Sequence, residues 1–328
     1  VKRVMTEREI LATTNHPFIA TMYASFQTES RLCFVMEYCA GGEFFRVLQR
    51  QPKRRLKEDA ARFYAAEVLL ALEYLHYLGF IYRDLKPENI LMRGTGHIAL
   101  TDFDLSKQAQ VLEPSVPKGN KRFSLKTLLN RGVSSESNLA KLNIIEQDNN
   151  VLSTESNSFV GTEEYIAPEV ISGTSQTNAV DWWTFGVLLY EMISGCTPFK
   201  GANLDETLQN IMTEPLKWPE DVDASPECKK IVKKLLSREA DKRLGAGQTG
   251  AQEIRQHKFF KDIQFSLIRN ESPPMVPPVK DPLDMSQYGP LKEDDEDVAL
   301  DESKMTATQN PFGNFSIRRD SEIVNRQY

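Results

Sequence analysis

The hydrophobic pattern at the start of the chain predicts a helix followed by two short strands. Apolar residues within 4–11 fall at helical spacing, and Pro17 predicts the end of this helix, because the residue before a proline disfavours helical backbone angles. Apolar runs at 18–26 and 32–36 predict the strands, and the pair Gly41-Gly42 predicts a break after them. This order is typical of a small sheet that leads into a linker.

A second pattern, which starts with 57–78, predicts a mainly helical region. Apolar residues line one face of this segment, and Gly79 stands where a helix is expected to stop. Residues 80–82 and 97–101 predict short strands. Residues 182–193 are apolar on nearly every side, which predicts a helix buried at the centre of a helical lobe.

Two stretches lack the pattern of a folded core. Residues 108–157 are rich in Ser, Asn, Lys and Gln, and the stretch exceeds the ~15 residues beyond which loops are usually functional or disordered. The tail, 261–328, contains a proline cluster at 273–278 and an acidic run at 293–302, a composition that cannot fold alone. We therefore predict an insertion and a regulatory tail attached to a folded region.

Composition narrows the class of protein. The chain has 328 residues, 40% hydrophobic and 26% charged, which is enough to bury a sizeable core. A net charge of -6 argues against a general nucleic-acid binder, which usually carries a basic surface. The four cysteines have neither zinc-site nor disulfide-framework spacing, and no apolar run approaches the ~20 residues of a membrane helix. We expect a cytoplasmic protein, with association at a membrane surface left open.

Three short motifs follow one another along the chain. Residues 82–89 read Tyr-Arg-Asp-Leu-Lys-Pro-Glu-Asn, Asp102-Phe103-Asp104 follows, and Ala167-Pro168-Glu169 comes later. In this order they resemble the H-R-D-L-x-x-x-N, D-F-G and A-P-E motifs of eukaryotic protein kinases. The resemblance covers roughly residues 1–260, and the chain is identified as a member of the protein kinase A-like, or AGC, group of serine/threonine kinases.

The resemblance and the chemistry of phosphate assign roles to four residues. Asp84 is expected to orient the substrate hydroxyl and accept its proton, and Lys86 to neutralise the transferred phosphate. Asp102 and Asn89 are expected to hold Mg²⁺ at the phosphates of ATP. A single Asp beside a turn is more often a loop-capping carboxylate. The complete order of the motifs is what favours catalysis here.

The family implies a bilobal α+β kinase fold. A small lobe would occupy 1–38, and a mainly helical large lobe would occupy 39–260 and include the insertion at 108–157. Because the chain opens at Val1 on a helical pattern, we expect the small lobe to be incomplete, with the glycine-rich loop and ATP-binding lysine of the family lying upstream. This chain alone is then expected to be inactive. The apolar residues expected to be left uncovered are Phe18, Ile19, Phe34 and Val35.

The resemblance also implies a nucleotide site between the lobes. Glu7 is expected to pair with the ATP-binding lysine, with an exposed helical Glu as the plain alternative. Met36 is expected to be the gatekeeper at the start of the hinge. The residues implied to contact ATP are Glu37, Cys39, Glu43, Leu91 and Thr101. The residues implied to form a hydrophobic column between the lobes are Leu11, Met22, Tyr82 and Phe103.

One motif places the chain within the group. Asp104 stands where glycine is usual, and phototropin-like and fungal members of the group are similar in carrying D-F-D together with an insertion before the activation site. Residues 102–107 and 108–157 match both features, while Phe44-Phe45 and 310–316 favour the same branch, with the fungal members closer. Without glycine the loop has less backbone freedom to flip between active and inactive forms.

Regulatory and structural roles follow from the same resemblance. Ser158 is expected to be an activation site for an upstream kinase, because a phosphate adds about -1.5 to -2 charge that Arg83 and Lys107 can grip. A plain loop serine is the alternative. Further residues with an implied structural or regulatory role are Thr162, Glu169, Asp181 and Arg243. Tail residues that resemble a hydrophobic motif docking on the small lobe, with a chance F-x-x-F match as the alternative, are Phe312, Phe315 and Ser316.

The resemblance implies a class of substrate. Glu43, Glu88 and Glu191 match positions that face arginines upstream of the phosphorylated residue, so a basic-directed kinase of protein Ser or Thr is expected. We also expect the protein to be a monomer. A structural glutamate is the alternative, above all for Glu191 in its buried helix. A pseudokinase or docking scaffold is the alternative function, and a small-molecule kinase is disfavoured because 161–169 resembles a peptide-substrate platform.

Overall fold

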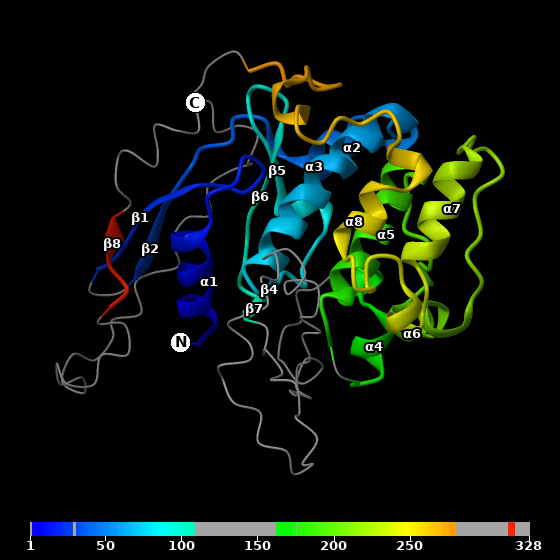
Figure 1. Ribbon diagram of the computed structural model, residues 1–328, viewed down its shortest axis with the longest axis horizontal. Coiled ribbons are helices and arrows are strands. Elements are labelled where there is room, and N and C mark those ends of the chain that lie inside the picture. The colour runs from blue at the N-terminus through cyan, green and yellow to red at the C-terminus, as the bar shows by residue number, and fades with distance from the viewer. Residues whose placement is uncertain (1, 29–30, 109–161, 175, 280–313, 319–328) are drawn as a thin grey trace, which may run out of the picture.

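The computed structural model describes residues 2–28, 31–108, 162–174, 176–279 and 314–318. Strands and one helix gather on one side of the molecule, and a cluster of helices gathers on the other (Figure 1). This is the bilobal α+β architecture that the sequence predicts. The strands that carry the site motifs lie between the two parts.

The small lobe contains one helix and a three-stranded sheet. Its elements are α1 (Lys2–Thr13), β1 (Met22–Gln27), β2 (Leu32–Met36) and β8 (Ile317–Arg318). The sheet has the order β2-β1-β8, with antiparallel pairing throughout. The first helix and the second strand have the positions that the sequence predicts. The third strand comes from the tail. The family resemblance predicts that the tail docks on the small lobe, but the sequence pattern did not indicate a strand there.

The first predicted strand begins later than expected. Leu100 donates its N–H to the carbonyl of Phe18 at 2.9 Å, and Ala20 donates to the carbonyl of Leu100 at 2.8 Å. Residues 18–20 therefore hydrogen-bond to the large lobe, and β1 starts only at Met22. This contact also contradicts the expectation that Phe18 and Ile19 are uncovered, because both are at most 2% exposed.

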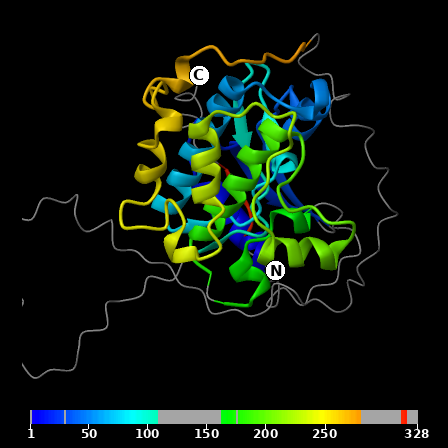
Figure 2. The same cartoon turned by 90° about the vertical axis from the view of Figure 1, so that its right-hand side faces the viewer.

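Helices make up most of the large lobe, as the sequence predicts (Figure 2). They are α2 (Phe44–Gln49), α3 (Glu58–Tyr77), α4 (Pro168–Ile171), α5 (Ala179–Ser194), α6 (Leu204–Thr213), α7 (Pro226–Leu235) and α8 (Ala251–Arg255). Short 3-10 turns are η1 (Pro52–Arg54), η2 (Pro87–Asn89), η5 (Thr162–Tyr165), η6 (Ala240–Lys242), η7 (Lys258–Phe260) and η8 (Ile268–Asn270).

The core of the large lobe forms around α5. This helix is buried on almost every side, as its continuous apolar sequence requires. Gly186 lets α7 approach closely, because a Cβ at this position would lie 2.8 Å from the Cβ of Leu235. Helix α3 packs beside α5 through the apolar face predicted for it, and Gly79 closes α3 with a φ of 83°.

Short strands hold the site motifs between the helices and the small lobe. They are β3 (Gly42–Glu43), β4 (Phe80–Ile81), β5 (Ile90–Met92), β6 (Ile98–Leu100) and β7 (Lys107–Gln108). Strands β3, β5 and β6 form one sheet in that order, and β4 pairs with β7. A Cβ on Gly41 would lie 2.6 Å from the carbonyl oxygen of Met92, so the approach of the hinge to β5 requires glycine there.

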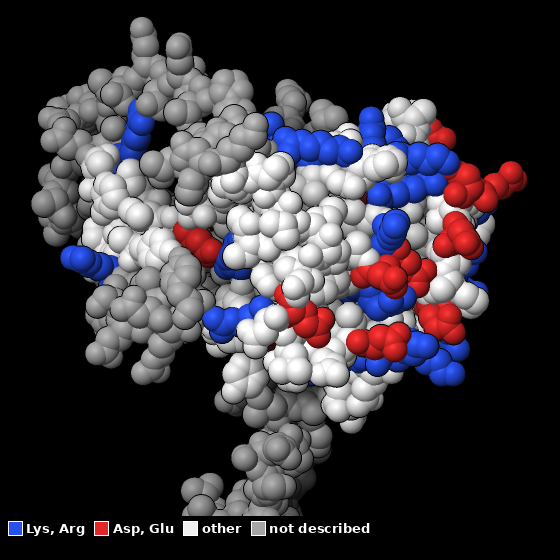
Figure 3. All heavy atoms as spheres, turned by 90° about the horizontal axis from the view of Figure 1, so that it is seen from above, with Lys and Arg blue, Asp and Glu red and all other residues white. Residues whose placement is uncertain are grey.

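The outer surface of the large lobe carries both signs of charge. Figure 3 shows Lys and Arg side chains intermixed with Asp and Glu side chains on one face of this lobe. Among the described helices, none is both long and apolar enough to cross a bilayer.

Candidate active site

The segment before β5 brings a carboxylate, an amine and an amide together. The Nζ of Lys86 lies 2.9 and 3.1 Å from the two carboxylate oxygens of Asp84. The Nδ2 of Asn89 donates to the Oδ2 of Asp84 at 2.7 Å and to its backbone carbonyl at 2.9 Å. Both Asp84 and Asn89 are less than 10% exposed. The loop therefore fixes one carboxylate in a single orientation.

The same surroundings set the charge of Asp84. Burial raises the pKa of Asp84, while the hydrogen bond and charge of Lys86 and the hydrogen bond from Asn89 oppose that rise. A raised pKa makes a carboxylate a better proton acceptor. These contacts are the ones expected of a general base that must be held in place.

Asp181 holds the backbone of this loop from α5. Its Oδ2 accepts the N–H of Tyr82 at 2.9 Å, and its Oδ1 accepts the N–H of Arg83 at 2.7 Å. The Nε2 of His76 lies 2.7 Å from Oδ2. Arg83 has a φ of 70°, a costly conformation for a residue with a side chain, and the two backbone bonds to a fully buried carboxylate hold it there.

The Asp102-Phe103-Asp104 motif lies beside the catalytic loop. Asp102 has a φ of 59°, and its Oδ1 accepts the N–H of Asp104 at 3.3 Å. Asp104 itself has no positive φ, so in this conformation the strained residue is Asp102 and the replacement of glycine costs no backbone strain. Phe103 is fully buried, with its ring 5.4 Å from that of Tyr82. The other predicted column residues, Leu11 and Met22, are also buried.

Glu7 of α1 faces this motif. The pKa of Glu7 is raised to about 7, mainly by burial and also by the charges of Asp102 and Asp104, while a hydrogen bond from the backbone of Phe103 opposes the rise. Arg3, one turn earlier, lies 3.9 Å from Asp104. Glu7 is partly buried, unlike the exposed helical glutamate of the plain alternative, and its pairing with a lysine stays a prediction.

The predicted hinge residues differ in what their side chains can reach. The carboxylate of Glu37 is held by Arg93, so a contact of Glu37 with a nucleotide would have to use its backbone. Cys39 is fully buried against Ala20 and Ala99, and burial raises the pKa of its thiol to about 12. The partly buried Met36 packs against the core and against this small cluster.

The remaining predicted nucleotide contacts lie on the adjacent sheet. Leu91 of β5 pairs with Glu43 of β3, and the carboxylate of Glu43 lies 3.3 Å from the Nε of Arg46. The carbonyl of Thr101 accepts the hydroxyl of Tyr82 at 2.6 Å. These residues line the same edge of the large lobe as the hinge.

A cavity of about 530 Å³ lies between α2, η5 and the end of α5. Two predicted substrate residues, Glu88 and Glu191, line it together with Glu163 and Glu164. The pKa of Glu191 is raised to about 7, mainly by burial and also by the neighbouring carboxylates, while the hydroxyl of Tyr165, which donates to it, opposes the rise. The Nζ of Lys200 lies 2.6 Å from Glu164, a partner that the sequence did not indicate.

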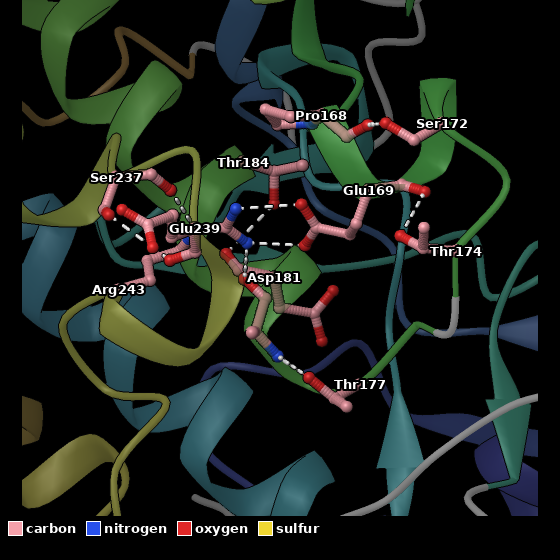
Figure 4. Close-up of polar contacts among 11 residues, drawn as sticks. Pro168, Glu169, Ser172, Thr174, Thr177, Asp181, Thr184, Ser237, Glu239 and Arg243 are labelled. Carbon is pink, nitrogen blue, oxygen red and sulfur yellow. Dashed lines mark hydrogen bonds and ion pairs between the residues drawn. The ribbon is translucent and has the colours of Figure 1, made fainter.

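A buried ion pair anchors the Ala167-Pro168-Glu169 motif (Figure 4). The Nη1 and Nη2 of Arg243 lie 2.6 and 2.8 Å from the two carboxylate oxygens of Glu169. Arg243 also donates to the carbonyls of Ala179 at 2.7 Å and Ser237 at 3.0 Å. The pair ties α4 to the residue that follows η6.

The tail residues that the structure describes lie on the small lobe. Phe315 is fully buried, its ring 5.3 Å from that of Phe34, and its carbonyl accepts the hydroxyl of Ser25 at 2.6 Å. This contact covers one face of Phe34, whereas Val35 is 43% exposed. Ser316 is exposed.

The structure describes some of the predicted regulatory residues and not others. Lys107 lies in β7, opposite Ile81 of β4, and Thr162 opens η5. Ser158, Phe312 and most of the predicted insertion lie outside the described residues.

One glycine-rich stretch proves to be structural. Gly245, Gly247 and Gly250 have the spacing G-x-G-x-x-G, which can mark a phosphate-binding loop. The carboxylate of Glu253 already occupies the inside of this turn, where it accepts the N–H of Gly245 at 3.3 Å and the hydroxyl of Thr249 at 2.9 Å. A carboxylate in that position would repel a phosphate.

The chain was compared with known proteins. The profile of the family described as "Protein kinase domain" matches residues 1–129 and 143–260. Flippase kinase 1 of Saccharomyces cerevisiae is 52% identical over 277 residues, 84% of this chain and 29% of that protein. The serine/threonine-protein kinase nrc-2 of Neurospora crassa is 50% identical over 296 residues, 89% of this chain and 45% of that protein.

A plant relative is similar to nearly the same degree. Phototropin-2 of Oryza sativa subsp. japonica is 49% identical over 301 residues, 92% of this chain and 31% of that protein. The chain therefore spans less than half the length of each of these three relatives. The fungal and phototropin-like resemblance predicted from Asp104 and the insertion agrees with these relatives.

Proposed function

Because the chain belongs to the protein kinase family, among serine/threonine kinases of the AGC type, we propose that its site transfers the γ-phosphate of ATP to Ser or Thr hydroxyls of proteins. The observation that carries this proposal is the arrangement of Asp84, Lys86 and Asn89. A buried carboxylate with a raised pKa, oriented by an amide and an amine, suits a group that accepts a proton from a hydroxyl.

The residues present fit ATP with Mg²⁺. Asp102 is exposed in a strained conformation beside the loop, and Asn89 uses its amide nitrogen on Asp84, which leaves its amide oxygen as the group for a cation. The described residues contain no cluster of three or more His, Cys, Asp or Glu suited to a metal. This agrees with Mg²⁺, which is usually held by one or two protein ligands and the phosphates of the nucleotide, whose charge it neutralises.

The cavity beside the catalytic loop supports a basic-directed specificity. Glu164 is paired with Lys200, so the negative charge of the cavity comes from Glu88, Glu163 and, as pH rises past about 7, Glu191, with Arg54 as the other cation in the lining. Carboxylates bind a guanidinium through paired, charge-assisted hydrogen bonds. The proposed substrates are therefore proteins with arginine near the phosphorylated Ser or Thr. We also propose, from the family resemblance of the segment around Ser158, that another kinase activates this one by phosphorylating Ser158.

A docking scaffold without catalysis is the competing function. A scaffold would have no need for a buried base with a raised pKa or for strain at Asp102, and both features are present. Catalysis is therefore the better-supported function of the site.

The test is the variant Asp84→Asn, made in the full-length protein. Its turnover on an arginine-containing peptide should fall by about 10² to 10⁴-fold, the usual contribution of a general base, with MgADP affinity nearly unchanged. Asp59→Asn is the matched control, because the Asp59 carboxylate is 91% exposed on α3. Turnover that survives in Asp84→Asn would remove this residue from catalysis, and a wild-type protein that binds MgADP without phosphorylating any peptide would favour the scaffold.

A further inference from the structure

One arginine outside the kinase motifs binds three separate parts of the molecule. Arg93 follows β5, and its guanidinium takes both carboxylate oxygens of Glu37, with Nε 2.5 Å from Oε1 and Nη2 2.9 Å from Oε2. Its Nη1 donates to the carbonyls of Pro17 at 2.5 Å and Ile98 at 2.8 Å. Its Nη2 also reaches the carbonyl of Ile19, at 3.5 Å.

These contacts use every hydrogen-bond donor of the Arg93 side chain. A guanidinium has five N–H donors in a fixed planar fork, and an acceptor is present for each of them. The pair is mostly removed from water, since the side chains of Arg93 and Glu37 are 19% and 12% exposed. Burial opposes the charge of Arg93, and the hydrogen bond and charge of Glu37 outweigh it, so the pKa of Arg93 is raised.

The partners identify what the guanidinium joins. Glu37 is the first residue after β2, at the hinge between the lobes, while Pro17 and Ile19 belong to the connection between α1 and β1. Ile98 begins β6, and Arg93 directly follows β5, the neighbouring strand. One side chain thus links the hinge, the small-lobe connection and the sheet of the large lobe.

The hinge backbone is fixed by the same arrangement. The Oε2 of Glu37 accepts the N–H of Thr21 at 3.2 Å, and the N–H of Glu37 donates to the carbonyl of Thr21 at 2.7 Å. With its carboxylate held by Arg93, Glu37 cannot rotate its peptide groups without breaking several hydrogen bonds. In the proposed nucleotide site this hinge lies beside adenine, and because the N–H of Glu37 is already bonded to Thr21, the carbonyl of Glu37 and the residues after it are the backbone groups left to face the base.

We propose that Arg93 is a positioning residue for nucleotide binding, which holds the hinge through Glu37 so that its backbone is ready to meet adenine. The proposal rests on the proposed kinase function, because it takes the hinge as the adenine site. Preorganisation lowers the cost of binding, so losing it weakens nucleotide affinity without removing any group that touches the nucleotide. Effects on peptide binding are expected to be small, since neither Arg93 nor Glu37 lines the acidic cavity.

The experiment compares Arg93→Met, Arg93→Lys and Glu37→Gln in the full-length protein. MgADP dissociation constants are measured by titration calorimetry, alongside Tm and the KM for ATP and for peptide. We expect MgADP affinity to fall about tenfold in Arg93→Met and severalfold in Glu37→Gln, with peptide KM within about twofold of wild type. Arg93→Lys keeps the charge and loses the fork, so it should fold and still bind MgADP more weakly than wild type.

A matched control separates positioning from simple loss of stability. Arg62 of α3 pairs with Glu58 at 2.9 Å, and both side chains are 18% exposed, close to the burial of the Arg93–Glu37 pair. Arg62→Met should lower Tm and leave MgADP affinity within about twofold of wild type. Equal MgADP affinity in wild type and Arg93→Lys, with only Tm reduced, would show that Arg93 is structural. Wild-type protein that binds no MgADP would instead refute the nucleotide site itself, and the proposal with it.

Discussion

Removing Arg243 should cost more stability than any surface substitution in the large lobe. The side chain is fully buried, and Glu169 opposite it is 7% exposed. In Arg243→Met the carboxylate of Glu169 would stay in the core without a cation, and the carbonyls of Ala179 and Ser237 would lose their donor. Burying an uncompensated charge is the dominant effect.

The size of the effect follows from these contacts. Breaking a buried ion pair by removing one partner typically costs about 3–5 kcal/mol, and the hydrogen bonds to the two carbonyls are part of the same loss. We take about 4 kcal/mol, a large share of the ~5–15 kcal/mol that holds a typical domain together. For a domain of this size each kcal/mol lowers Tm by roughly 2–4 °C, so Tm should fall by about 8–16 °C.

The assay is thermal denaturation of the full-length protein, followed by far-UV circular dichroism. Lys242→Met is the matched control: Lys242 is the preceding residue, and its pair with Glu239 is about two-thirds exposed on both sides, so water screens the pair and its loss should barely change Tm. The double variant Glu169→Gln/Arg243→Met removes the uncompensated charge and should recover about half of the loss. If the Tm of Arg243→Met lies within about 2–3 °C of the Tm of Lys242→Met, roughly the error of such a measurement, the buried ion pair contributes much less stability than about 4 kcal/mol.

Two further predictions concern the tail and the cavity. Phe315→Ala should undock β8 and expose Phe34, so protease cleavage near 314–318 should become at least about tenfold faster. The control Ser316→Ala, at the neighbouring exposed position, should be cleaved at the wild-type rate. Equal cleavage rates in the two variants would refute docking. Glu191 has a pKa of about 7, so its carboxylate is neutral below that pH and charged above it. The KM for an arginine peptide should therefore fall as pH rises from about 6 to 8 and should be flatter with pH in Glu191→Gln; matching pH profiles would remove Glu191 from arginine recognition.

The local hydrophobic pattern predicted the elements whose buried positions repeat within their own sequence. The apolar faces of α3 and α5 repeat within a few residues, so their positions could be read from spacing alone, and Gly79 marked the end of α3. The strand β2 was also predicted with its observed bounds. The strand predicted at 18–26 failed in part because residues 18–20 bond to Leu100, a partner that no local pattern can reveal.

The sequence by itself determined the order of the chemical motifs and, through them, the family. It placed Asp84, Asn89 and Asp102 in one site because their spacing is fixed by short connections that the fold must respect. Only the tertiary structure decided the contacts between distant segments: Arg93 with Glu37 across the hinge, and Arg243 with Glu169, 74 residues apart. Such pairs form because folding brings their backbones together, and residue type alone does not say which carboxylate a buried arginine will meet.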